Sequence, residues 1–521
     1  MKSFLKEWKY TILTGVGILI FAFLIRLYNL TLLPVFADEA IYIRWSQIMS
    51  AEPTLRFLPL SDGKQPFYMW VLMFVVGRVS DPLFAGRVLS VVSGIGSIVG
   101  IFAVSYLLFK NKLVSLVSSF IWTISPFSFF FDRMALVDSF LACFTIWTLF
   151  FAVLTSKTKR LDTAIITGFA LGFALLTKSP AIFTVLLIPT TWIFIKKPRD
   201  LFRLVPFLFV TYVVGYAMYN ILRLGPNFHL VGSRNQDYIF PISHLWINPK
   251  DPFIFHIEQI FKDWFVKMGP WPILGLAVVG FLASFKRYWK ETLLLLAWFL
   301  FPVLVQSMYA KVFTVRYILF TFPPLFILAA SGFLQKKKLF LIFYSFLMVL
   351  FIGTALYFDY QLLTNLEKAN LPSSERSGYL EEWTNGTGIK EVSDYLKAQN
   401  DKNPSEKIVV GTEGYFGTLP DGLQMYVQGI TNITVIGTGL DFGEVPQSLI
   451  DSFKAGNKTY FVVNSSRLKI KEENFEKNGL KVIAKYVKSD RREKDTHEFL
   501  WYGPHDTFYF FQLVELISPK D

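Results

Sequence analysis

Long runs of apolar residues recur along the first two thirds of the chain, and they leave little choice of fold class. The runs at 83–108 and 113–131 are two examples, in a chain of 521 residues that is 53% hydrophobic but only 17% charged. About 20 apolar residues are needed to cross a hydrocarbon core of about 30 Å. In soluble proteins about a quarter of the residues are charged. The chain is therefore predicted to be a mainly α-helical, polytopic membrane protein.

Eleven membrane spans are predicted from these runs. They lie near residues 10–29, 83–108, 113–131, 135–154, 162–177, 180–195, 202–222, 271–285, 291–308, 313–333 and 339–357. The first run follows Lys6 and Lys9 and so resembles a signal peptide, but it is too long for one and no cleavage site of small residues follows it. We expect it to remain in place as the first transmembrane helix.

Basic residues between the spans indicate the orientation of the chain. Five short connections are rich in Lys and Arg, among them 157–160 and 336–338, and counting the spans puts all five on the side of the N-terminus. Positively charged connections stay in the cytoplasm. The N-terminus is therefore expected to be cytoplasmic, in a cell membrane that the chain crosses many times. The chain has a net charge of +13. We attribute this charge to the basic residues beside the spans, which are attracted to anionic lipid of the cytoplasmic leaflet, and not to nucleic-acid binding.

Three larger segments fall on the opposite side of the membrane. They are a loop at 31–81, a second outer segment at 224–270 and everything after 358. The last segment alternates stretches typical of helix and of strand, which favours a small α/β domain. The expected elements are helices at 388–399 and 445–455 and strands at 407–411 and 460–464. The predicted domains are thus a transmembrane domain, 1–357, and a C-terminal extracytoplasmic α/β domain, 358–521.

Ionisable residues gather at the outward ends of the predicted spans, where such groups are by default candidates for function. They are Asp38, Glu39, Lys64, Asp132, Arg133, Asp138, Lys178, Lys311 and Arg316. Transfer of a sugar from a phosphate needs a carboxylate that accepts the hydroxyl proton and fixed cations against the departing phosphate. Two structural explanations compete with a catalytic role for these residues. Long basic side chains can anchor helix ends at the membrane surface, and Asp132 and Arg133 can form a local salt bridge.

Several motifs resemble one known family. In chain order they are FADEAIYIRW, GKQPFYMW, GRVLSVVSG, FFDRMALVDSFLACF, GFALGFALLTKSPAIF and VRYILFTFPP. Over roughly residues 10–335 the chain resembles the polyprenyl-phosphate-sugar glycosyltransferases of the GT-C superfamily, and is most similar to protein O-mannosyltransferases and lipid A aminoarabinose transferases. The resemblance implies a GT-C-type bundle of about eleven helices. It also implies inverting transfer of a sugar from a polyprenyl-phosphate-linked donor to a hydroxyl of a protein, lipid or glycan at the outer face.

The resemblance also implies roles for single residues. Asp38 matches the catalytic carboxylate, with Glu39 beside it, and Asp138 matches a supporting acid. The positions near the donor phosphate and its lipid carrier are matched by Tyr42, Lys64, Lys178, Arg316 and Tyr317. Arg133 and Arg234 also lie in segments predicted on the outer side, so both are further candidates for binding the phosphate.

Two departures from the family pattern bear on the substrate. The first lies in the Lys-Pro-Pro element, where Gln65 replaces the first proline and Gly63 stands where aminoarabinose transferases have an acid, although Asp62 is one position away. The second is Ile41, which stands where aminoarabinose transferases have an arginine. Both argue against aminoarabinose as the sugar. Paired carboxylates are hard oxygen ligands, so Asp38 and Glu39 could hold a divalent metal, but fixed cations can stabilise the same charge and no cofactor is expected to be required.

Two other functions remain as alternatives. An oligosaccharyltransferase with a lipid diphosphate donor would share the fold, but no acidic acceptor-reading motif stands out in the C-terminal segment. A transporter or flippase of lipid-linked sugar predicts inverted repeats and helix breaks near the midplane. No convincing repeat is visible, and the charged residues lie at the outer edge instead.

Overall fold

The computed structural model describes residues 2–514, with side chains from Lys6 onward. The chain divides into two compact units. Unit 1 comprises Met1–Leu30, Pro53–Val71 and Arg87–Pro372. Unit 2 comprises Thr31–Glu52, Leu72–Gly86 and Ser373–Asp521. The segment that carries Asp38 and Glu39 therefore belongs to the same unit as the C-terminal sheet.

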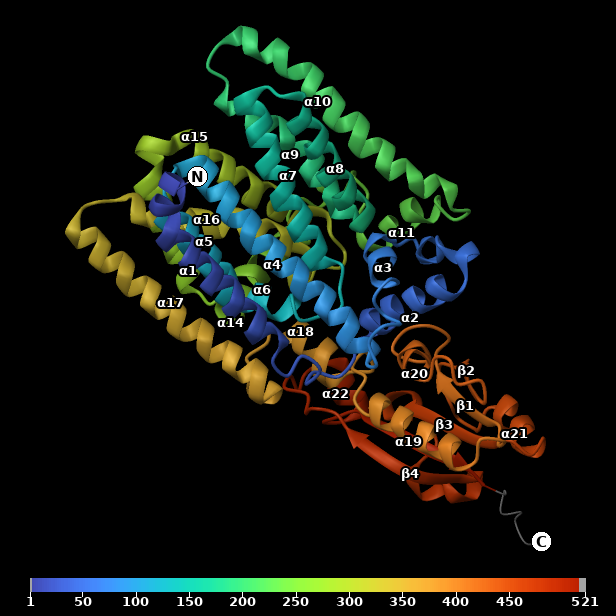
Figure 1. Cartoon of the computed structure of the whole chain (residues 1–521). Helices are drawn as coiled ribbons and strands as arrows, with labels where there is room; N and C mark the ends of the chain where they lie inside the picture. Colours follow the sequence, from blue (N-terminus) through green and yellow to red (C-terminus); the bar gives the residue numbers. More distant parts are fainter. Residues whose placement is uncertain (1, 515–521) are drawn as a thin grey trace, which may run out of the picture. The chain divides into compact units, whose positions relative to one another are not determined.

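Unit 1 contains the long apolar helices (Figure 1). The helices that lie wholly or mostly in it are α1 (Lys2–Leu27), α3 (Phe67–Leu72), α4 (Pro82–Phe109), α5 (Lys112–Ile124), α6 (Pro126–Phe131), α7 (Asp138–Thr158), α8 (Leu161–Thr177), α9 (Ile182–Leu187), α10 (Pro198–Tyr219), α11 (Leu230–Tyr238), α12 (His244–Ile247), α13 (Phe253–Gln259), α14 (Phe265–Lys267), α15 (Pro272–Tyr309), α16 (Phe322–Ala330) and α17 (Lys338–Thr364). Short 3-10 turns complete several of them, among them η2 (Leu58–Asp62), η3 (Ser179–Ala181) and η7 (Val315–Thr321).

The apolar runs of the sequence coincide with these helices, which confirms the mainly helical membrane fold. Among the described residues, 7 helices are long and apolar enough to cross a membrane, and three further apolar segments are shorter: Lys112–Ile124, Leu161–Thr177 and Ser179–Phe194. The spans predicted at 271–285 and 291–308 together form α15. Its helical geometry breaks at Tyr288, with φ −125° and ψ 40°, within the basic connection that separates the two predicted spans. The number of membrane crossings stays a prediction.

Small residues allow the helices of unit 1 to approach closely. α8 packs against both α7 and α10, and a Cβ on Gly168 of α8 would lie 2.8 Å from the carbonyl oxygen of Thr211 in α10. α15 packs against α16, where a Cβ on Gly280 would lie 1.9 Å from the carbonyl oxygen of Leu328. Interfaces of this kind are typical of helices that associate in a membrane, where close van der Waals packing replaces the hydrophobic effect.

Unit 2 is built on a five-stranded sheet with strand order β2-β1-β3-β5-β4. The strands are β1 (Ile408–Glu413), β2 (Ile433–Gly439), β3 (Lys458–Asn464), β4 (Leu480–Val487) and β5 (Thr507–Leu513). β1 pairs in parallel with β2 and β3, whereas β5 pairs antiparallel with β3 and β4. The helices of this unit are α2 (Ala37–Ala51), α18 (Ser373–Arg376), α19 (Ile389–Lys402), α20 (Asp421–Tyr426), α21 (Gln447–Lys454) and α22 (His497–Tyr502).

Helices cover both faces of this sheet, and Figure 1 shows α19 in front of the strands. On one face Tyr395 of α19 packs edge-on against Tyr460 of β3, with ring centroids 6.0 Å apart. On the other face Leu449 of α21 is fully buried in a cluster with Phe461, the next residue of β3, and Phe511 of β5. Successive residues of a strand point to opposite faces, so the apolar run of β3 serves both layers. The predicted small C-terminal α/β fold is confirmed.

Candidate active site

The two predicted carboxylates lie in the first turn of α2. The helix begins at Ala37, after the N-cap Phe36, and the positive end of its dipole favours acidic residues there. Glu39 is fully buried, and its Oε2 accepts a hydrogen bond of 3.0 Å from the backbone N–H of Phe36. Glu39 thus caps its own helix, as an acidic residue at the third helical position commonly does. Asp38 is only partly buried, so it is the better placed of the two to meet a substrate.

Tyr42 follows one turn later on the buried side of α2. Its side chain is 6% exposed, and its ring centroid lies 6.4 Å from that of Trp45. Its backbone carbonyl accepts a hydrogen bond of 2.7 Å from the hydroxyl of Ser46. These contacts give Tyr42 a packing role within α2, and its expected role near the lipid carrier stays a prediction.

A carboxylate that was not singled out as a site residue, Asp62, organises two of the predicted cations in unit 1. The Lys64 Nζ lies 3.4 Å from Asp62 Oδ2, and the Arg234 guanidinium donates to Asp62 Oδ1 and, at 2.9 Å, to the Tyr238 hydroxyl. Gly63 between them has φ +63°, and a Cβ there would lie 2.5 Å from the carbonyl oxygen of Leu230 in α11. The loop can press against α11 because this residue is glycine.

A second group of predicted residues surrounds the ring of Tyr317 in η7. The Lys178 Nζ lies 4.2 Å from the ring centroid, and the Arg316 Cζ lies 5.5 Å from it. Lys178 also forms an ion pair of 2.6 Å with Asp138 Oδ1. Asp138 begins α7 and Lys178 is the C-cap of α8, so two helix ends and η7 meet here. Aromatic faces attract cations, which holds both basic groups near the ring.

A side chain–side chain hydrogen bond joins these two groups. The Nε2 of Gln65 donates to the Oγ of Ser179 over 2.8 Å, and these residues directly follow Lys64 and Lys178. The structure thereby brings together six of the predicted residues: Lys64, Asp138, Lys178, Arg234, Arg316 and Tyr317. With Asp62 included, four basic side chains face two acidic ones, so this cation cluster carries an excess of positive charge suited to a phosphate.

Arg133 and Asp132 have other partners than expected. Arg133 is 7% exposed, and its guanidinium donates to the carbonyl oxygens of Arg26 at 2.8 Å, Tyr28 at 2.7 Å and Asn29 at 2.9 Å. Asp132 forms its ion pair with Arg26, at 3.1 Å, with both side chains 0% exposed. The interpretation of Asp132 and Arg133 as a local salt bridge is therefore wrong. Arg133 satisfies the carbonyl groups at the end of α1, and binding of the donor phosphate by Arg133 stays a prediction that this geometry does not favour.

Comparison with known proteins identifies the fold. Residues 63–220 match the family of dolichyl-phosphate-mannose-protein mannosyltransferases, and no curated protein matches. The crystal structure of ArnT from Cupriavidus metallidurans in the apo state aligns over 99% of this chain and 100% of its own, with a TM-score of 0.61 at 14% identity. The chain has the GT-C fold.

Other solved structures with the GT-C fold are similar to this chain to different degrees. ArnT from Cupriavidus metallidurans bound to undecaprenyl phosphate aligns over 98% of this chain and 100% of its own, with a TM-score of 0.59 at 14% identity. The S. cerevisiae protein O-mannosyltransferase Pmt1-Pmt2 complex bound to the sugar donor aligns over 45% of this chain and 36% of its own, at 15% identity and a TM-score of only 0.35. The two ArnT alignments confirm the predicted resemblance for the fold.

Within the GT-C fold the two parts of the candidate site come from different units. α2 with Asp38 belongs to unit 2, and the cation cluster belongs to unit 1. That Asp38 and the cluster face one cavity stays a prediction. Among the described residues, no group of three or more His, Cys, Asp or Glu side chains is placed to hold a metal ion.

Sequence reasoning gave no site role to the two residues that assemble the cation cluster, Asp62 and Gln65. Asp62 lies two positions before Lys64, so its proximity to a predicted cation was a usable signal. Gln65 was noticed only as a departure from the family pattern. Its partner Ser179 is 114 positions away, and no local pattern predicts such a contact.

Proposed function

We propose that this protein transfers a sugar from a polyprenyl-phosphate carrier to an acceptor hydroxyl at the outer face of the membrane. The observation that carries the proposal is the cation cluster, in which the Gln65–Ser179 bond joins Lys64 and Arg234 to Lys178 and Arg316. The GT-C fold supports it, because the similar ArnT binds undecaprenyl phosphate. The match to dolichyl-phosphate-mannose-protein mannosyltransferases over residues 63–220 supports it too.

In this proposal the cation cluster binds the donor phosphate. A phosphate oxygen accepts hydrogen bonds from ammonium and guanidinium groups, and such charge-assisted bonds are about twice as strong as neutral ones. Lys64 and Lys178 are partly exposed, with side chains at 16% and 20%, so both retain a surface that a ligand can reach. As the sugar leaves, negative charge grows on the phosphate, and cations already fixed by Asp62 and Asp138 stabilise it without reorganising.

Asp38 is proposed as the base of a single displacement with inversion. Its carboxylate accepts the proton of the acceptor hydroxyl, the hydroxyl oxygen forms a bond to the anomeric carbon, and the bond from that carbon to the phosphate oxygen breaks. The electron pair leaves with the polyprenyl phosphate. Glu39 caps α2 and holds the start of the helix in place. The reaction therefore uses one carboxylate, because a phosphate leaves without being protonated.

We also propose that no divalent metal is needed. The developing charge on the phosphate is met by Lys64, Lys178, Arg234 and Arg316, which is the role that a metal ion has in other phosphate chemistry. Turnover should then be unchanged by EDTA. A loss of turnover with EDTA that Mg²⁺ or Mn²⁺ restores would assign the charge stabilisation to a metal instead.

The test of the proposed function separates carrier binding from turnover in the full-length protein in lipid nanodiscs. Undecaprenyl phosphate measures binding, and labelled undecaprenyl-phosphate sugars measure transfer to a cell-envelope fraction. Asp38→Asn should lower turnover by about 10²-fold or more with binding unchanged. Lys64→Ala should weaken binding as well as turnover, because it removes a cation from both ground and transition states.

Glu39→Gln is the matched control for Asp38→Asn. Glutamine keeps an acceptor oxygen for the Phe36 N–H, so α2 stays capped and turnover should remain near that of the wild type. Normal turnover in a folded Asp38→Asn protein, with loss in Glu39→Gln, would move the base to Glu39. Movement of the lipid-linked sugar across the bilayer with no transfer in any variant would identify a flippase.

A further inference from the structure

The start of α2 is paired with a strand-like segment of the C-terminal part of unit 2. The backbone N–H of Ala37 donates to the carbonyl oxygen of Thr384 over 3.0 Å, and the N–H of Gly386 donates to the carbonyl oxygen of Val35 over 2.8 Å. Phe36 and Asn385 form the antiparallel bridge between them. The next residue in the chain after this pairing is Asp38.

The rest of α2 is attached to the same part of the chain. Arg44 Nε donates to the Gln424 side-chain oxygen over 3.2 Å, and Gln47 Nε2 donates to the carbonyl oxygen of Met425 over 2.9 Å; both partners lie in α20. The ring of Trp45 stacks on that of Phe416, with centroids 5.5 Å apart. α2 is therefore held along two turns as well as at its start.

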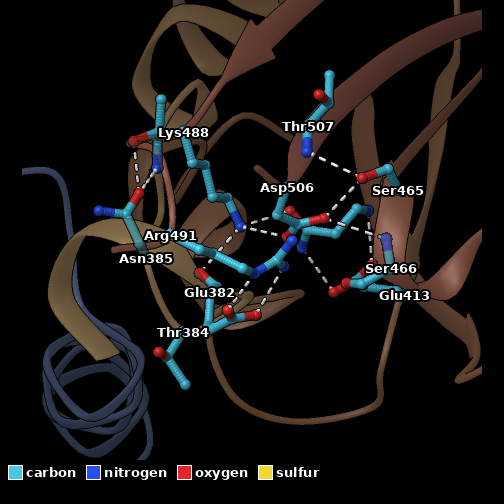
Figure 2. A network of polar contacts seen from close by, with 12 residues as sticks. Glu382, Thr384, Asn385, Glu413, Ser465, Ser466, Lys488, Arg491, Asp506 and Thr507 are labelled. Atoms are coloured by element: carbon cyan, nitrogen blue, oxygen red, sulfur yellow. Dashed lines mark hydrogen bonds and ion pairs between the residues drawn. The ribbon is translucent and has the colours of Figure 1, made fainter. Parts of the chain in front are cut away.

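A buried ion network supports the segment that pairs with α2 (Figure 2). Lys488 Nζ donates to the carbonyl oxygen of Glu382 over 3.0 Å and to Asn464 Oδ1 over 2.6 Å, and it lies 3.0 Å from Asp506 Oδ2. The Lys488 and Asp506 side chains are both 0% exposed. The Glu382 carboxylate accepts from Arg491 Nε and Nη2, at 2.6 and 3.0 Å. Glu382 is thus held through both its backbone and its side chain, two residues before Thr384.

The same network is anchored at the ends of the central strands (Figure 2). Asp506 Oδ1 accepts from Ser465 Oγ at 2.8 Å and from the Ser466 N–H at 3.0 Å. At the end of β1, the Glu413 carboxylate accepts from the backbone and side-chain N–H groups of Asn464, at the end of β3, both at 2.7 Å. Burial raises the pKa of Glu413. Replacing a buried ion pair by apolar side chains often leaves stability unchanged, whereas removing one partner is destabilising, so such a pair holds the segments that it joins in one arrangement.

We propose that this network and the pairing of 384–386 with 35–37 form a positioning device for the Asp38 carboxylate, which rests on the proposed function of Asp38. The contacts run without a gap from the strand ends through Lys488 and Glu382 to Thr384 and Ala37, one residue from Asp38. A misplacement of a reacting group by about 1 Å can lower the rate of the chemical step about 10²-fold. Glu382, Gly386 and Lys488 are then positioning residues that act on turnover through α2 without touching the donor.

Gly386→Ala tests the device at its most sensitive point. A Cβ on Gly386 would lie 2.5 Å from Val35 Cγ1 and 2.7 Å from the Val35 carbonyl oxygen, so the methyl group must shift either Val35 or the segment 384–386, and both shifts disturb the pairing that precedes α2. Gly443→Ala is the matched control, because a Cβ there meets nothing within 4 Å. In full-length protein in nanodiscs, Gly386→Ala should lower kcat about 10- to 100-fold with unchanged affinity for undecaprenyl phosphate, and Gly443→Ala should change neither. Adding Val35→Ala to Gly386→Ala should recover part of kcat.

Hydrogen–deuterium exchange supplies a readout that does not depend on activity. The amides of residues 37–42 should exchange faster in Gly386→Ala than in the wild type, and those of β3 should not. Unchanged exchange, or equal losses of kcat and of carrier affinity, would overturn the positioning device. A wild-type protein with no transfer would instead overturn the proposed function of Asp38, and faster exchange at 37–42 would still establish that the segment 384–386 controls the start of α2.

Discussion

The side chain of Gln65 donates a hydrogen bond of 2.8 Å to the hydroxyl of Ser179, across 114 positions of the chain. Gln65 is 6% exposed and Ser179 is half-buried, so loss of the bond would take a hydrogen-bond partner from the buried amide of Gln65. It fixes the separation of Lys64 and Lys178, each one residue before a bonded side chain. The residue that departs from the family motif therefore has a structural role in the cation cluster.

Gln65→Leu should raise the KM for the lipid-linked donor about tenfold, because Lys64 and Lys178 lose their fixed separation. Ser179→Ala should have a similar effect, and the double variant should be little worse than either single variant, since both remove the same bond. A double-mutant cycle on KM and on thermal stability measures this coupling. Additive effects of the two substitutions would mean that the bond does not link the two lysines in function.

Asp138→Asn should destabilise the protein more than removal of an exposed acid does. Its side chain is 1% exposed and pairs with Lys178, and removing one partner of a buried ion pair costs about 3–5 kcal/mol. Because Lys178 is itself 20% exposed and can reach water, the expected loss is at the lower end of that range. Asp162→Asn is the control, since its pair with Arg160 is 54% and 66% exposed and such pairs contribute about 0–1 kcal/mol. Thermal unfolding in nanodiscs compares the two, and equal melting temperatures would contradict the prediction.

The Lys488–Asp506 pair should make the stability of the fold depend on pH. Burial acts to raise the pKa of Asp506, but Lys488, Ser465 and Ser466 outweigh it and lower the pKa below its ordinary value of 3.8. An acid whose pKa is lowered in the folded state stabilises the fold above its unfolded pKa, and this contribution is lost as the pH falls through the folded pKa. Asp506→Asn should therefore lower the melting temperature at pH 7, and the difference from the wild type should shrink below about pH 4. A difference that is constant with pH would show that the charge of Asp506 does not matter.

Cysteine labelling should report the orientation of the chain. Cys143 is the single cysteine, so a Cys143→Ser background allows one new thiol at a time. Lys454→Cys, on the exposed surface of α21, should react with an impermeant thiol reagent in intact cells or spheroplasts. Lys336→Cys should react only after the membrane is permeabilised, because basic connections face the cytoplasm. The opposite pattern would reverse the predicted orientation.

The fold was predictable from the sequence where periodicity or composition carries the signal. The apolar run at 162–177 coincides with α8, and the strand expected at 460–464 lies within β3 (Lys458–Asn464). β2 was not predicted, because its sequence ITVIGTG ends in small and polar residues. β4 and β5 were not predicted either, and they pair antiparallel at the other side of the sheet.

The candidate site was predictable in its residue types but not in its assembly. Family motifs pointed to Lys64, Lys178 and Arg316, whereas the contacts that join them depend on packing between distant segments. The ion pair of Arg26 with Asp132 shows the same limit: it spans 106 positions, and adjacency in the sequence suggested Arg133 instead. Hydrogen bonds between remote residues follow from the tertiary structure and leave no periodic pattern.

The pairing of 35–37 with 384–386 has a consequence for biosynthesis. The two segments are separated by roughly 350 residues, and ribosomes add about 5–20 residues per second. The start of α2 therefore emerges roughly 17–70 s before the segment that completes it. During that interval the nascent chain contains Asp38 without the partner that sets its position. We therefore expect the proposed transfer activity only after translation has passed the segment at 384–386 and the C-terminal sheet has formed.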